Sequence, residues 1–147
     1  MSIQKIPNWI LASVLILASL GFIDATYLTI SHYVGADLYC GVSGGCSTVT
    51  NSAYSTFMGM YVSVYGMLYY MSILISTVIY IDTKNKKIIK LLIILPAIGF
   101  LFSLYLVYLQ LFVINAICIY CMASASISTL LLIINMFLIQ NYKKLIN

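Results

Sequence analysis

Arginine and glutamate are absent from this sequence, and charged residues of any kind are scarce. Only 7% of the 147 residues are charged and 63% are hydrophobic, whereas roughly a quarter of a soluble domain is charged. This small number of charged groups is insufficient to cover the surface of a water-soluble protein, which excludes a water-soluble fold. The net charge of +4 comes from lysines at the ends of apolar runs, which form no basic face for nucleic acid. The composition therefore predicts an integral membrane protein.

Proline is also rare, so the apolar runs are seldom interrupted. They are long enough to cross a bilayer, and one crossing requires about 20 residues. The run from Trp9 to Ile30 exceeds the h-region of a signal peptide and precedes no small-x-small cleavage site, so we interpret it as a retained span. The run over 88–139 is too long for one crossing and must fold back. We expect an all-α, four-transmembrane-helix bundle forming a single domain over 1–147, with spans at about 9–34, 58–81, 88–113 and 116–139 and an outer loop at 35–57.

The fold-back in the last apolar run is placed at Asn115. Asparagine is a preferred N-cap residue, so Asn115 is expected to open the fourth span. Pro96 is expected to kink the third span rather than to end it.

The lysines set the orientation of these spans. Both chain termini and the 82–87 loop share one side, and all seven lysines fall on it or just inside its boundary. By the positive-inside rule this side is cytoplasmic. We therefore expect a multi-pass protein of the cell membrane with cytoplasmic N- and C-termini. The lysines are Lys5, Lys84, Lys86, Lys87, Lys90, Lys143 and Lys144.

The four cysteines all fall on the outer side of this map. Cys40 and Cys46 lie in the first outer loop, and Cys118 and Cys121 form a C-x-x-C motif at the outer end of the fourth span. The outer compartment is oxidising, so disulfides persist there. Because the hydropathy and the lysines alone place both pairs on one membrane face, the agreement indicates thiol–disulfide chemistry.

The two cysteine pairs differ in their surroundings. The C-x-x-C spacing places Cys118 and Cys121 on one helix face. With Asn115 as the N-cap, Cys118 is the third helical residue, and the positive end of the helix is expected to lower the pKa of its thiol. Three glycines within 41–45 leave the backbone of the loop pair pliable. A mobile disulfide suits a shuttle between a soluble partner and Cys118.

Three other interpretations of the cysteines remain open. They are two structural disulfides, a zinc site using all four residues, and incidental buried thiols. A disulfide within one helical turn adds little to a membrane bundle, and C-x5-C with C-x2-C departs from the usual zinc-ligand spacing. Incidental thiols leave the common membrane face unexplained.

Taken in order, these features resemble the vitamin K epoxide reductase (VKOR) family over nearly the whole chain. Residues 21–33 are similar to a stretch common in microbial members. Ser52 follows six residues after Cys46, as the loop Ser/Thr of the family does, and Gly59 and Gly66 match the small residues that open its second span. A C-x-x-C motif alone is weak, whereas the order of loop pair, serine, second span and C-x-x-C is specific.

The resemblance implies a membrane thiol–disulfide oxidoreductase that supports disulfide-bond formation. It implies that a separate thioredoxin-like or DsbA-like protein reduces the loop pair at Cys40, that Cys46 then attacks Cys118, and that Cys121 faces and reduces a quinone of the menaquinone or ubiquinone type. No metal is implied. Ser52 is implied to hydrogen-bond a quinone oxygen or to order the loop, and a turn or cap residue is the alternative.

Two positions depart from the family pattern. Tyr61 stands where many microbial members have proline, so the start of the second span is expected to differ in shape. Ser55 falls where animal members carry a quinone-binding asparagine, so that contact is not carried over. The thioredoxin-like domain fused to many bacterial members is absent from this sequence, so a separate thiol protein is expected to supply electrons.

Two ionisable residues lie in or near the end of the first span. An acid inside a membrane is costly, so Asp24 is expected to serve proton delivery or helix packing. His32 lies near the outer surface, where an interface role is equally consistent.

Two further functions are alternatives to the family assignment. A DsbB-type disulfide oxidase performs similar chemistry, but its C-x-x-C lies in the first outer loop, so the order of the pairs is reversed. A small transporter or adaptor subunit held together by disulfides or zinc is the other alternative.

Overall fold

Four long helices form the protein in the computed structural model, which describes residues 6–36, 40 and 44–146. They are α1 (Asn8–Val34), α3 (Val62–Thr83), α4 (Lys86–Tyr108), which continues as a π-helix (Leu109–Ile114), and α5 (Ile119–Ile146). All four are long and apolar enough to cross a membrane. The prediction of a four-transmembrane-helix bundle is confirmed.

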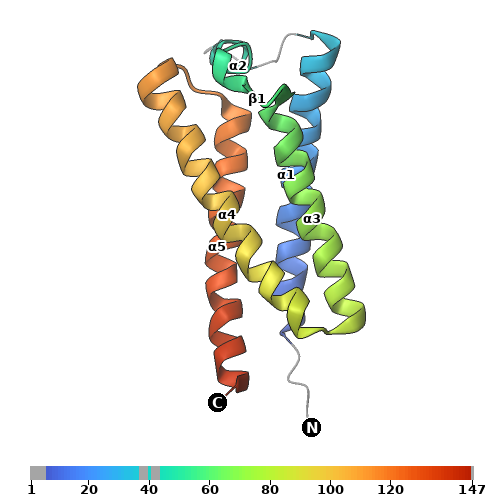
Figure 1. Ribbon diagram of the computed structural model, residues 1–147. Helices are drawn as coiled ribbons and strands as arrows, with labels where there is room; N and C mark the ends of the chain where they lie inside the picture. The colour runs from blue at the N-terminus through green and yellow to red at the C-terminus, as the bar shows by residue number, and fades with distance from the viewer. Residues whose placement is uncertain (1–5, 37–39, 41–43, 147) are drawn as a thin grey trace.

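The helices run up and down, so their ends gather at two faces of the bundle (Figure 1). The start of α1, the turn between α3 and α4 and the end of α5 lie at one end. The short helix α2 (Gly45–Thr50) and the connection from α4 to α5 lie at the other end. Helix α1 packs against α3 and α5, and α4 packs against α5 and α3.

The outside of the bundle carries many large apolar side chains, as helices that face lipid require. Ile23, Leu101 and Phe112 are each more than 60% exposed. The interior holds Ile10, Ala18, Tyr70, Ile73 and Leu131, so the apolar core continues from one end of the bundle towards the other.

The second long helix starts at Val62 rather than near residue 58 because a short hairpin comes first. Strand β1 (Thr56–Phe57) pairs with β2 (Met60–Tyr61) in antiparallel fashion. The two residues of the turn, Met58 and Gly59, have φ of 50° and 82°. Positive φ at both positions matches the twist of a two-residue hairpin and is incompatible with a helix.

The prediction that Asn115 is the N-cap of the fourth span is wrong. Asn115 has φ of 54° and ends the π-helix, and α5 begins only at Ile119. Asparagine tolerates this left-handed conformation better than most residues do. Cys118 therefore lies just before the first residue of α5 and is not the third residue of the helix.

Pro96 lies inside α4, as predicted. Proline removes one donor from the helical hydrogen-bond ladder. On the same turn, the carbonyl of Ile93 accepts a 2.6 Å hydrogen bond from Nδ2 of Asn135 on α5. The helical donor that proline lacks would have bonded the carbonyl of Leu92, one residue earlier, so Asn135 ties α5 to the α4 backbone on the turn of Pro96.

Candidate functional site

Three of the four cysteines form one buried cluster at the α2 end of the bundle. Cys40 and Cys46 form a disulfide with a Cα–Cα distance of 5.9 Å, and Cys118 and Cys121 are free thiols. Cys40 is 5% exposed and Cys46 and Cys118 are fully buried. Cys121 packs against this cluster while remaining partly exposed. The structure therefore brings together the four cysteines that the sequence places on one membrane face.

Two glycines dock the loop disulfide against the segment that carries Cys118. Gly44 precedes α2 with a left-handed φ of 55°. A Cβ atom on Gly45 would overlap the backbone carbonyl of Ile117, so only glycine allows α2 to approach this closely. Residues 41–43, which include the third glycine expected to make the loop pliable, lie outside the described residues.

Gln110 holds the connection that ends in Cys118. Its side chain is 2% exposed, and its Oε1 accepts a 3.1 Å hydrogen bond from the backbone N–H of Cys118. Its backbone carbonyl accepts the N–H groups of Asn115 and Ala116. One residue of the π-helix thus satisfies three donors of the connection. Sequence reasoning did not single out Gln110, although a lone amide in an apolar run is a signal for this role.

The C-x-x-C motif places Cys118 over the first turn of α5. Its Sγ accepts a hydrogen bond from the backbone N–H of Cys121 at 3.5 Å. Hydrogen bonds from the Cys121 thiol and from the backbone of residues 120 and 121 lower the pKa of Cys118 to about 7, while burial opposes them. A thiol with this pKa is substantially ionised at neutral pH, and the thiolate is the nucleophile in disulfide exchange.

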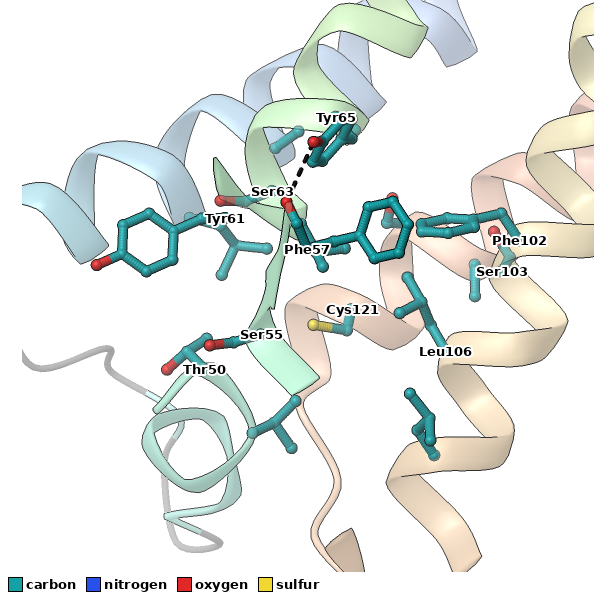
Figure 2. Close-up of a pocket in the computed structure, with 18 of the residues that line it drawn as sticks. Thr50, Ser55, Phe57, Tyr61, Ser63, Tyr65, Phe102, Ser103, Leu106 and Cys121 are labelled. Atoms are coloured by element: carbon teal, nitrogen blue, oxygen red, sulfur yellow. Dashed lines mark hydrogen bonds between the residues drawn. The ribbon is translucent and has the colours of Figure 1, made fainter. Parts of the chain in front are cut away.

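A cavity of about 350 Å³ opens next to Cys121. Figure 2 shows the Cys121 side chain among the lining residues, with Leu106 of α4 on one side and Thr50 and Ser55 on the other. Cys121 is the one cysteine among the described residues that line it. The wall is mostly apolar and aromatic, and its rings belong to Tyr54, Phe57, Tyr61, Tyr65, Tyr69, Tyr70 and Phe102.

The polar residues singled out in the sequence all line this cavity: Asp24, His32 and Ser52. Oδ2 of Asp24 is buried and has no hydrogen-bond partner in the described part of the chain. The Ser52 hydroxyl donates to the carbonyl of Val49 at 2.7 Å, as a turn residue would, and lines the cavity as well. The role of Ser52 towards a ligand stays a prediction.

Tyr61, one of the two departures from the family pattern, packs against the end of α1. Its ring lies 3.6 Å from that of His32 and 5.3 Å from that of Tyr33, measured between centroids. An aromatic cluster thus joins the hairpin to α1 at the cavity. Ser55, the other departure, lines the cavity, and its hydroxyl donates to the carbonyl of Ser52 at 2.8 Å.

A buried tyrosine joins α3 to α5 below Cys121. The Tyr70 hydroxyl lies 3.0 Å from the carbonyl of Ser124, 2.8 Å from its Oγ and 3.2 Å from Oγ of Ser128. Sequence reasoning missed this network. The signal was the spacing of Cys121, Ser124 and Ser128, which at i, i+3 and i+7 share one helix face.

One known protein family matches most of the chain. The sequence profile described as "Vitamin K epoxide reductase family" matches residues 12–136, a stretch that contains all four cysteines together with Asp24 and Ser52. The resemblance drawn from the order of these motifs is confirmed. No curated protein matches the chain.

Proposed function

Since the chain belongs to the vitamin K epoxide reductase family and is a multi-pass membrane thiol oxidoreductase, we propose that it oxidises a thioredoxin-like partner and passes the electrons to a quinone. The observation that carries the proposal is the position of Cys121. It packs against the cluster of Cys40, Cys46 and Cys118 and also lines the cavity. Electrons that enter at the loop disulfide therefore have a contiguous path to a ligand in the cavity.

The first step belongs to the loop disulfide. A thiolate of a separate thioredoxin-like or DsbA-like partner attacks Sγ of Cys40 and releases Cys46, and the second thiol of the partner resolves the mixed disulfide. The partner leaves with its own disulfide, and Cys40 and Cys46 become thiols. Cys40 is 5% exposed and Cys46 is fully buried, which supports attack at Cys40.

The second step moves the two electrons to the C-x-x-C motif. The Cys46 thiolate attacks Cys118 in an oxidised Cys118–Cys121 pair and releases Cys121, and Cys40 then attacks Cys46 and releases Cys118. The loop disulfide is restored and the C-x-x-C pair holds two thiols, which is the arrangement in the structure. The low pKa of Cys118 favours its release as a thiolate.

The cavity suits a quinone of the menaquinone or ubiquinone type. Its volume falls in the range of small-molecule pockets, about 300–1,000 Å³, and its aromatic wall with few polar groups is typical of them. When bound, a quinone accepts two electrons and two protons. The Cys118 and Cys121 thiols release both in forming their disulfide, and Asp24 and Ser52 supply polar groups in the same cavity.

The positions of the lysines support one orientation of the bundle in the membrane. Lys84, Lys86, Lys87 and Lys90 lie around the α3–α4 turn, and Lys143 lies near the end of α5, all at the end of the bundle away from α2 (Figure 1). Lys5 lies outside the described residues. We propose that this end is cytoplasmic, so that the cysteines meet their partner on the extracytoplasmic side.

The direct test is quinone reduction by the purified protein in detergent, with a reduced thioredoxin-like protein as electron donor. We expect turnover in the wild type and none in Cys121→Ala, whereas Ser126→Ala on the exposed side of α5 should retain it. Absence of turnover in the wild type with menaquinone and ubiquinone analogues and several donors would contradict the proposal.

A further inference from the structure

The half of α4 that follows Pro96 forms one wall of the cavity and ends beside Cys118. Phe102, Ser103 and Leu106 line the cavity from this half of the helix (Figure 2). Gln110, in the π-helix that continues α4, lines it one turn further along. Residues three or four apart share one helix face. A ligand in the cavity therefore lies against the helix face that ends at Gln110.

Two residues of the cavity wall bond directly to Cys118. Cys121 donates its backbone N–H to Sγ of Cys118 at 3.5 Å. Gln110 accepts the backbone N–H of Cys118 through Oε1 at 3.1 Å, and its side chain is 2% exposed. Cys121 is the redox partner of Cys118, whereas Gln110 belongs to a different helix. The Gln110 amide oxygen is thus committed to Cys118, and the residue links the α4 wall to the buried thiol.

Two irregular points of the helix bracket this wall. Pro96 interrupts the hydrogen-bond ladder of α4, and the helix becomes a π-helix from Leu109 onwards. Helices bend at prolines and at π-helical turns. Before Pro96, the hydrogen bond from Asn135 to the carbonyl of Ile93 holds α4 against α5. A displacement of the stretch after Pro96 is therefore passed on to Gln110 rather than to the first half of α4.

We propose that Gln110 is a positioning residue that couples the cavity to Cys118, so that a bound acceptor and the redox state of the C-x-x-C motif influence each other. This inference rests on the proposed function. A disulfide holds its two sulfurs in a narrow geometry, so closing the Cys118–Cys121 pair moves Cys118 relative to Gln110. The α4 wall then follows Cys118, or the hydrogen bond breaks. An acceptor that fits the dithiol form is held less tightly once the disulfide has formed, which favours release of the reduced product.

Ligand affinity in the two redox states tests this coupling. The probe is a redox-inert 1,4-dimethoxynaphthalene with a short isoprenoid chain. It is titrated by calorimetry into detergent-solubilised protein whose C-x-x-C pair is either a dithiol or a disulfide. We expect the wild-type dithiol form to bind about fivefold more tightly, the lower end of ordinary coupling between sites. The loop disulfide of Cys40 and Cys46 is kept intact in both preparations.

Substitutions at Gln110 separate its contribution from that of Cys121. In Gln110→Leu and in Gln110→Met, which keeps the length of the side chain without its oxygen, the affinity ratio should fall towards one. Gln110→Glu retains an oxygen acceptor for the N–H of Cys118 and should restore most of the ratio. Gln140→Leu on the exposed face of α5 is the matched control and should keep the wild-type ratio. Thermal unfolding confirms the fold of each variant.

A reciprocal measurement needs no variant. Because coupling between two equilibria is mutual, saturating probe should shift the dithiol–disulfide equilibrium of wild type about fivefold towards the dithiol. Glutathione redox buffers set this equilibrium, and mass spectrometry of alkylated Cys118 and Cys121 reports it.

Equal affinity in the two redox states, or no binding of the probe, would overturn the inference and leave the proposed function to the turnover assay. A ratio of wild-type size in Gln110→Leu and Gln110→Met would also overturn it, since Cys121 would then carry the coupling alone. Absence of quinone turnover in wild type would overturn the proposed function and this inference with it.

Discussion

Oε1 of Gln110 accepts the backbone N–H of Cys118 at 3.1 Å, so a residue of the α4 extension fixes the start of α5. The reactive thiol is thereby held by a neighbouring helix as well as by its own. The α4 chain departs from regular α-helix over Leu109–Ile114, and a π-helical turn of this kind often occurs at functional sites.

We predict that Gln110→Leu destabilises the protein and impairs the C-x-x-C motif. The substitution leaves the buried N–H of Cys118 without its partner, which costs about 1–3 kcal/mol. Thermal unfolding in detergent should report the loss, and alkylation of Cys118 followed by mass spectrometry should report its altered reactivity. Gln140→Leu on the exposed face of α5 is the control. Equal melting temperatures for the two variants would contradict the prediction.

The reactivity of Cys118 should depend on pH at neutrality. Its pKa of about 7 lies below the ordinary thiol value of 9.0, so the alkylation rate should rise with pH and reach half its maximum near pH 7. Cys121→Ala removes the hydrogen bond that contributes most to this lowering, so the midpoint should move upward. Peptide-resolved mass spectrometry follows Cys118 alone. A midpoint that stays at pH 7 in Cys121→Ala would show that Cys121 does not set the pKa.

We predict that Gly45→Ala slows electron transfer between the cysteine pairs, because α2 contacts the segment that carries Cys118. The added Cβ meets the carbonyl of Ile117, so α2 must move away from the segment. In a chain with Cys40→Ala and Cys121→Ala, mild oxidation should link Cys46 to Cys118, and Gly45→Ala should reduce the yield several-fold.

The control for this experiment is Gly66→Ala. A Cβ at Gly66 meets only Cβ of Ala25, at an ordinary 3.6 Å. If Gly45→Ala and Gly66→Ala cross-link equally well, the docking of α2 does not govern the approach of Cys46 to Cys118.

The hydrogen bonds of Tyr70 predict a structural effect for Tyr70→Phe. The substitution removes the link from α3 to Ser124 and Ser128. Hydrogen bonds between membrane helices contribute about 0.6 kcal/mol on average and at most about 1.7 kcal/mol, so a modest loss of unfolding free energy is expected. Tyr105→Phe should have no effect on stability. An unchanged free energy of unfolding in Tyr70→Phe would show that the network is not stabilising.

Hydropathy and charge predicted the bundle well because they are summed along the chain. A span is recognised by apolar length alone, so the four helices and the place of Pro96 inside α4 followed from composition. The break near Asn115 was located correctly, but Asn115 ends the third span and is not the N-cap of the fourth. A residue that serves as an N-cap also tolerates the left-handed conformation, and only the path of the chain decides between these uses.

The sequence by itself therefore determined a membrane bundle with both cysteine pairs at one end, since the lengths of its apolar runs and the positions of its lysines allow little else. The tertiary structure decided which cysteine meets the cavity and which helices contact one another beside it. Cys121 lines the cavity while Cys118 is buried, and Tyr69 reaches α4 because residue 99 is glycine. These relationships join residues far apart in the sequence, and they depend on how the helices rotate and pack against one another.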